Sequence, residues 1–156
     1  MSTKLIKLLA ITRMPFTSAS LLPIFLVASY FYSINIESIS ILNFCLCSVG
    51  VLLAHLSTNM FNDYFDNVDG TDSGNFNYFQ QVSGGSRAIE LGLITEKKLF
   101  HLATIFLALA GMLGLGIMLF LGDSRLGLLY YGLAGAFSAY FYTGTPLRLV
   151  ARKGMG

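Results

Sequence analysis

Four long apolar stretches follow one another along the chain, separated by shorter polar segments. Each is about as long as the 20 helical residues that cross a bilayer. They lie near 16–34, 39–61, 99–121 and 126–143. The pattern therefore predicts an all-α integral membrane protein, a helical bundle with four transmembrane helices. We expect residues 1–156 to form a single membrane domain, because only one polar segment between the stretches, 63–98, is long.

The composition supports this interpretation. Hydrophobic residues make up 54% of the chain and charged residues 12%, whereas a soluble domain has about 25% charged residues. The 16 glycines suit close packing of helices in lipid. The net charge of +2 is too small to indicate a nucleic-acid partner, so the expected surroundings are a lipid bilayer.

Nine of the ten Lys and Arg residues precede the first stretch, lie in the long polar segment, or follow the fourth stretch. Only Arg125 lies on the opposite side. Because basic residues concentrate on the cytoplasmic side of membrane proteins, we expect a multi-pass protein of the cell's inner (cytoplasmic) membrane. Its N-terminus and its long polar segment would face the cytoplasm.

The segment "NDYFDNVDGTD", 62–72, holds four of the eight acidic residues: Asp63, Asp66, Asp69 and Asp72. If the second helix continues into it, four polar side chains at spacings 0, 3, 4 and 7 share one helical face: Asn59, Asn62, Asp63 and Asp66. Polar groups inside an apolar run are costly and usually line a cavity or a bundle interior. Mg²⁺ is typically held by one or two carboxylates together with substrate phosphates. The pattern predicts a platform for a metal-bound phosphate or diphosphate, and the alternative is a solvated acidic helix end.

Other phosphate and metal motifs fit less well. An EF-hand with Gly70 as its sixth residue would need acids where Phe65 and Phe76 stand. A P-loop would need Gly-Lys-Ser/Thr, which is absent. "DNVDG" at 66–70 matches the start of the CDP-alcohol phosphotransferase pattern, but Ser73 and Gly74 replace its Ala-Arg continuation. That activity remains a minor alternative.

The second half of the polar segment, "SGGSRAIELGLIT" at 83–95, adds a candidate anion site. Gly84 and Gly85 allow the backbone to approach an anion closely. Arg87 can bind phosphate oxygens in a bidentate manner and could neutralise a diphosphate leaving group. Taken alone, the same residues are typical of a flexible turn.

Two histidines lie near these elements. His55 precedes Asn59 by four residues on the same helical face, so it could support Asn59 or make a hydrogen bond between helices. His101 lies near the start of the third apolar stretch, where we expect an interfacial position.

The run "NMFNDYFDNVDGTD" followed by "SGGSRAIELGLIT" resembles the UbiA superfamily of intramembrane aromatic prenyltransferases. In that superfamily Asn-Asp-x-x-Asp ends the second helix and Arg-x-x-x-x-Gly follows, which here are Asn62, Asp63, Asp66, Arg87 and Gly92. The 1,4-dihydroxy-2-naphthoate polyprenyltransferase branch is most similar, through "SGGSR", "TRMPFT" and "YTGTPLRLVARKGMG". Met14 separates Arg13 from Pro15 in that branch's N-terminal motif, and Gly70 replaces an Asp of the hydroxybenzoate branch.

The resemblance implies a Mg²⁺-dependent transfer of a polyprenyl group from polyprenyl diphosphate to an aromatic acceptor of naphthoate or benzoate type, first of all 1,4-dihydroxy-2-naphthoate in menaquinone biosynthesis. The implied catalytic residues are Asp63, Asp66 and Arg87. The implied diphosphate-binding residues are Asn59, Asn62, Gly84, Gly85 and Arg87. The implied metal ligands are Asn62, Asp63, Asp66 and Asp72. Candidates to stabilise an allylic carbocation with their rings are Tyr64, Tyr140 and Tyr142.

Members of the superfamily are about twice as long, with nine helices and a second aspartate motif. This chain has no acidic residue after Asp123. We therefore expect a partial UbiA-type domain, corresponding to the N-terminal half. The alternative is a non-catalytic membrane fragment that lacks the second motif.

Overall fold

The computed structural model describes residues 3–34, 40–70, 85–119 and 125–154. Within them every regular element is helical, as the sequence predicted. Five α-helices and two short 3₁₀ helices follow in the order α1 (Thr3–Thr12), η1 (Met14–Thr17), α2 (Ser18–Ser33), α3 (Ile41–Val68), α5 (Glu96–Met118), α6 (Arg125–Phe141) and η2 (Leu149–Ala151).

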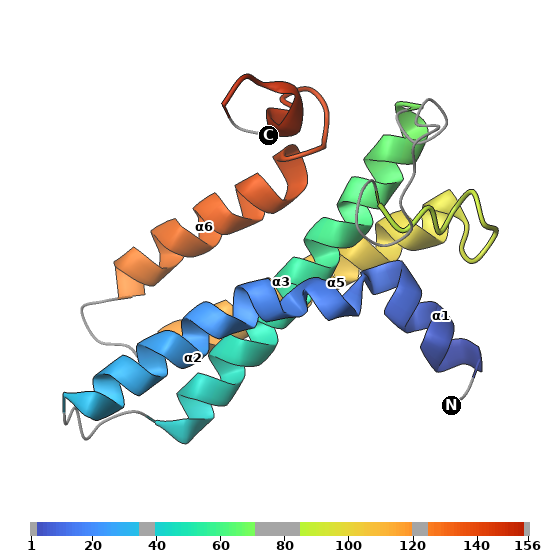
Figure 1. Cartoon of the computed structure of the whole chain (residues 1–156). Coiled ribbons are helices and arrows are strands. Elements are labelled where there is room, and N and C mark those ends of the chain that lie inside the picture. The colour runs from blue at the N-terminus through green and yellow to red at the C-terminus, as the bar shows by residue number, and fades with distance from the viewer. Residues whose placement is uncertain (1–2, 35–39, 71–84, 120–124, 155–156) are drawn as a thin grey trace.

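Helix α3 is the centre of the fold and packs most extensively against α5 (Figure 1). Helix α2 runs along α3, and α6 contacts both α3 and α5. The buried core lies where these helices meet, near the C-terminal half of α3: Leu56, Met60, Phe61, Phe65, Leu99 and Ala103, with Ile11 and Ala88. Ser57 donates a hydrogen bond of 2.8 Å to the Ala103 carbonyl, which fixes α3 against α5.

Aromatic rings join three helices at this core. The ring of Phe61 meets Phe100 of α5 and Tyr140 of α6 edge-on, with centroids 5.6 and 5.2 Å apart. Phe65 also meets Tyr140 edge-on at 5.4 Å. Such pairs contribute about 0.5–1.5 kcal/mol each beyond the burial of their surface. Tyr140 therefore has a packing role here, as does Tyr64, whose ring lies against Phe65 and Phe100.

Helix α3 continues well past its apolar part. It begins after Ser40, whose hydroxyl accepts a hydrogen bond from the Asn43 amide, and ends before Gly70, whose φ is +71°. A glycine in the left-handed conformation is a common helix terminator. The condition under which Asn59, Asn62, Asp63 and Asp66 share one helical face is thus met, because α3 continues to Val68. The apolar part, 41–61, is about 31 Å long, which matches the bilayer's hydrocarbon thickness, so the polar residues extend beyond it.

The prediction of four transmembrane helices is wrong. Among the described residues only α3 and α5 are long and apolar enough to cross a membrane. Helices α2 and α6 have 16 and 17 residues, or about 24–26 Å, which falls short of the bilayer core of about 30 Å. The apolar run at 16–34 loses its beginning to the 3₁₀ helix η1, and the run at 126–143 ends as a helix at Phe141.

The apolar surface of the two long helices faces outward. Only 11% of the most apolar window of either helix is buried within the chain. A surface helix of a soluble protein buries its apolar stripe, whereas a helix that is hydrophobic all round belongs in a large core or a membrane. Helices α3 and α5 therefore indicate association with a lipid bilayer.

Candidate anion and metal site at the end of α3

Asn59 ties the end of α1 to α3. Its side-chain amide donates a hydrogen bond of 3.1 Å to the backbone carbonyl of Thr12. Thr12 is itself buried, and its hydroxyl bonds back to the Leu8 carbonyl. Because Arg13 follows Thr12 directly, this contact places the first arginine of the site beside the C-terminal half of α3.

Asp63 is a buried carboxylate, only 2% exposed. The backbone amide of Ser86 donates to its Oδ1 at 2.8 Å, and the Ser86 hydroxyl donates to its Oδ2. Gly85, which is buried with φ at +63°, allows the chain to make the turn that delivers Ser86. Charge-assisted hydrogen bonds of this kind are about twice as strong as neutral ones. Asp63 therefore anchors the segment that carries Arg87.

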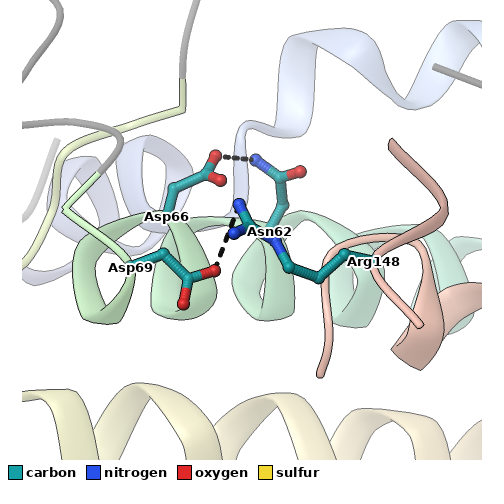
Figure 2. Close-up of polar contacts among 4 residues, drawn as sticks. All are labelled: Asn62, Asp66, Asp69 and Arg148. Atoms are coloured by element: carbon teal, nitrogen blue, oxygen red, sulfur yellow. Dashed lines mark hydrogen bonds and ion pairs between the residues drawn. The ribbon is translucent and has the colours of Figure 1, made fainter. Parts of the chain in front are cut away.

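The next two acids point to different partners. The side-chain amide of Asn62 donates to Oδ2 of Asp66 at 2.7 Å, and Arg148 makes a 3.2 Å ion pair with Asp69 (Figure 2). Arg148 comes from the C-terminal segment, and the other three residues come from the end of α3. Among the described residues, Asp63, Asp66 and Asp69 thus each have a partner within the protein.

Three arginines share an unusual backbone conformation. Arg13, Arg87 and Arg148 have φ values of 52°, 49° and 41°, and no other non-glycine residue among the described ones has a positive φ. Each such residue costs about 1–3 kcal/mol and persists where the surroundings enforce it, most often at functional sites. Each arginine is also connected to the polar end of α3. Arg13 follows Thr12 and Arg87 follows Ser86, both of which bond to α3 residues, and Arg148 pairs directly with Asp69.

The guanidinium groups are held differently. Arg13 lies over the ring of Phe16, 4.9 Å from its centroid, and Arg87 lies 3.6 Å from the Glu90 carboxylate. The Nε atoms of Arg13 and Arg148 are buried, and neither has a hydrogen-bond partner in the part of the chain described above. A buried donor without a partner costs about 1–3 kcal/mol. An anion that supplies oxygens to these donors would remove that cost.

Most of the residues predicted for the site gather at this end of the molecule. Asn59, Asn62, Asp63 and Asp66 lie on consecutive turns of α3, and Gly85 and Arg87 lie beside Asp63. The predicted residues Gly84 and Asp72 fall outside the described residues. Gly92 has a φ of +64° and closes the turn that follows Arg87, in which the Leu93 amide bonds to the Ala88 carbonyl.

The donor atoms at this site are compatible with Mg²⁺. The described residues contain no group of three or more His, Cys, Asp or Glu side chains placed to hold a metal. A Mg²⁺ ion that arrives with a substrate phosphate needs only one or two protein carboxylates. Asp63 and Asp66, on adjacent turns of α3, carry carboxylate oxygens, the kind of ligand that Mg²⁺ prefers, and both oxygens of Asp63 also accept hydrogen bonds from Ser86.

Sequence reasoning missed several members of the site. Ser86 and Arg148 were not singled out, although each binds one of the acids, and Arg13 was noted only as part of a motif. The ring of His55 makes a 2.7 Å hydrogen bond through Nδ1 with the Ser20 hydroxyl, which joins α3 to α2. Of the two alternatives for His55, the structure shows the hydrogen bond between helices. His101 is exposed near the start of α5.

An apolar groove of about 440 Å³ runs between α3, α5 and α6. All its lining side chains are apolar or are glycines, apart from Cys47, and small residues open it: Gly50, Ala54, Gly111, Gly114, Gly132 and Gly135. Its wall on α3 ends at Ala54, two turns before Asn62, or about 12 Å along the helix. The groove and the charged end therefore lie on the same helix.

No protein-family model matches this sequence, and no curated protein or solved structure matches the chain either.

Proposed function

We propose that the chain binds a polyprenyl diphosphate together with Mg²⁺ and takes part in transferring the prenyl group to an aromatic acceptor. The observation that carries this proposal is the arrangement along α3. A charged end with three strained arginines is followed, about 12 Å away along the helix, by an apolar groove. A lipid diphosphate has the same two parts, a compact anionic head and an apolar chain.

The arginines are the groups that would bind the head. Guanidinium groups bind phosphate oxygens in pairs of hydrogen bonds. The buried Nε atoms of Arg13 and Arg148 have no hydrogen-bond partner among the residues that the structure describes, so a phosphate could satisfy them. Ser86, held by Asp63, keeps Arg87 at the same end of α3. Three segments far apart in the sequence each contribute one of these cations.

Asp63 and Asp66 would hold the metal, with Asn62 orienting Asp66. When bound, Mg²⁺ would neutralise part of the charge of the departing diphosphate. Asp63 has a second task, because its buried carboxylate also holds the Ser86 segment in place. The two aspartates are therefore not equivalent, and a substitution of Asp63 affects the fold as well as the metal.

The groove would receive the apolar chain. Ligand sites of this kind are mostly apolar with a few polar groups that fix orientation, and here the polar groups lie at one end only. The first acceptor to test is 1,4-dihydroxy-2-naphthoate, on the basis of the sequence resemblance to the UbiA superfamily. The basic residues at the ends of the chain and in 63–98 favour an inner-membrane protein whose charged end faces the cytoplasm.

Binding and transfer should be measured separately on the purified chain in proteoliposomes. Labelled farnesyl or geranylgeranyl diphosphate should bind with Mg²⁺ and be released by EDTA, and Asp66→Ala should abolish this binding. Glu96→Gln is the control, because it removes an exposed carboxylate at the same end of the bundle, outside the proposed site. Binding that is unchanged by EDTA and unchanged in the Asp66→Ala variant would refute the proposal.

The transfer step is tested by incubation with dihydroxynaphthoate, hydroxybenzoate or a CDP-alcohol as the second substrate. Label in a prenylated naphthoate is the expected result. Lipid products formed only from the CDP-alcohol would assign the site to phosphotransfer instead.

A further inference from the structure

A second charged feature lies on the outer surface of α5, away from the groove. A hollow of about 350 Å³ is lined by Lys97, Lys98, His101, Leu102 and Ile105. Four of these residues fall at spacings 0, 3, 4 and 7 from Lys98, so they share one face of the helix. The far side of the helix carries Ala103, which is fully buried in the core. The hollow therefore opens to the surroundings of the protein.

The chemistry of this surface changes within one helical turn. Lys97 and Lys98 are exposed at the start of α5, and the apolar side chains of Leu102 and Ile105 follow directly. The same face continues with the exposed residues Leu109 and Met112. Lys97 and Lys98 form a cationic rim, and the apolar residues that follow them form a long apolar strip below it. This arrangement matches a phospholipid, whose phosphate lies at the membrane surface above its acyl chains.

Among the residues that the structure describes, no acid forms an ion pair with Lys97 or Lys98. Glu96, the acidic residue of the first turn, accepts a 2.8 Å hydrogen bond from Asn67 of α3 and does not line the hollow. His101 is fixed at the rim, since its Nδ1 bonds to the Lys97 carbonyl. Basic residues in the first turn of a helix also oppose the helix dipole, by about 0.3–1 kcal/mol each. Helix stability therefore does not explain two consecutive lysines at this place.

We propose that the hollow at the start of α5 binds an anionic phospholipid, with Lys97 and Lys98 around its phosphate and Leu102 and Ile105 against its acyl chains. Each Lys or Arg residue at the membrane surface attracts anionic headgroups. The helix that carries the hollow is one of the two, among the described residues, that are long and apolar enough to cross a membrane. This inference does not depend on the diphosphate site, which lies at the end of α3.

The test is equilibrium binding of fluorescent phosphatidylglycerol and fluorescent phosphatidylcholine to the full chain in uncharged detergent. The wild type should prefer phosphatidylglycerol, and Lys97→Gln with Lys98→Gln should reduce that preference roughly thirtyfold. Lys7→Gln with Lys153→Gln removes the same charge from exposed positions elsewhere and should leave the preference unchanged. Equal affinity for the two lipids, or equal loss in both double variants, overturns the proposal.

A second experiment distinguishes a site that binds a whole lipid from one that binds only a phosphate group. Inorganic phosphate at millimolar concentration should not displace phosphatidylglycerol, and Leu102→Ala with Ile105→Ala should weaken lipid binding several-fold. Displacement by phosphate alone, with no effect of the two alanines, would show that the surface binds phosphate without the acyl chains. Circular dichroism should be used to check that each variant is folded. If the double lysine variant is unfolded, the single variant Lys98→Gln replaces it.

Discussion

Ser86 binds both carboxylate oxygens of Asp63, one through its backbone amide and the other through its hydroxyl. Asp63 lies on α3 and is almost fully buried, whereas Ser86 lies in the segment that leads to α5. The pair therefore fixes a loop to a helix in the same place where the loop delivers Arg87. A single buried acid thus supports both the fold and the proposed anion site.

This double role predicts different outcomes for Asp63→Asn and Asp66→Asn. The first change removes a charge from two buried hydrogen bonds and should lower the free energy of unfolding by about 1–3 kcal/mol. Asp66→Asn affects a half-buried residue and should change the free energy of unfolding by less than about 1 kcal/mol. Both should abolish Mg²⁺-dependent diphosphate binding. Thermal unfolding in detergent and the binding assay give the two quantities, and equal stability of the two variants would contradict the role of Ser86.

The sequence predicted part of this site because part of it is local. Asn59, Asn62, Asp63 and Asp66 follow the period of one helix, so their shared position could be read from spacing alone. The contacts of Asp63 with Ser86 and of Asp69 with Arg148 join segments far apart in the chain, and no helical spacing encodes them.

The helix lengths and the arginine conformations could not be predicted from the sequence for other reasons. Hydropathy measures the length of an apolar run, but the 3₁₀ turn at Met14–Thr17 removes the start of one such run from its helix. Arginine has no preference for positive φ, so nothing in the local sequence predicts the backbone at Arg13, Arg87 or Arg148. The turn contains Pro15, which disfavours continuation of the preceding helix, whereas no local residue preference accounts for the three arginines.

The left-handed conformation of Arg148 makes a prediction of its own. Arg148→Ala should lose the ion pair with Asp69 and keep the backbone strain, whereas Arg148→Gly should lose the pair and relieve the strain. The glycine variant should therefore be more stable than the alanine variant by about 1 kcal/mol. Neither should bind diphosphate as the wild type does. An alanine variant as stable as the glycine variant would show that this backbone is unstrained.

The ion pair itself should contribute little to stability. The side chain of Arg148 is 35% exposed, and pairs of this kind contribute about 0–1 kcal/mol. A double-mutant cycle with Asp69→Asn and Arg148→Gln should give a coupling free energy in that range, and it should fall as salt is raised above about 0.15 M. A coupling several times larger and insensitive to salt would mean that the pair is more buried than its geometry indicates.

Gly144 should be intolerant of any side chain. A Cβ atom there would lie 2.5 Å from the Tyr140 carbonyl oxygen and 3.1 Å from the ring of Phe65. Because the carbonyl belongs to the backbone of α6 and cannot rotate away, Gly144→Ala should destabilise the protein by about 1–3 kcal/mol. Gly127→Ala is the control, since a Cβ at Gly127 meets no atom within 4 Å. Similar unfolding midpoints for the two variants would contradict the close packing of the tail on α3.

Filling the apolar groove should change which prenyl chains bind. Gly114 lines the groove, and a Cβ added there meets no atom within 4 Å, so Gly114→Leu can place its side chain in the groove without displacing a helix. Gly127→Leu makes the same change at a position with equal space that does not line the groove. Affinity should be measured with prenyl diphosphates of increasing length.

The shortest prenyl diphosphate should bind to Gly114→Leu with the same affinity as to the wild type, because the charged end is unchanged. Longer prenyl diphosphates should bind to Gly114→Leu progressively more weakly. Gly127→Leu should match the wild type at every length. A loss that is equal for all lengths, or equal in both variants, would place the apolar chain elsewhere and leave only the headgroup at the end of α3.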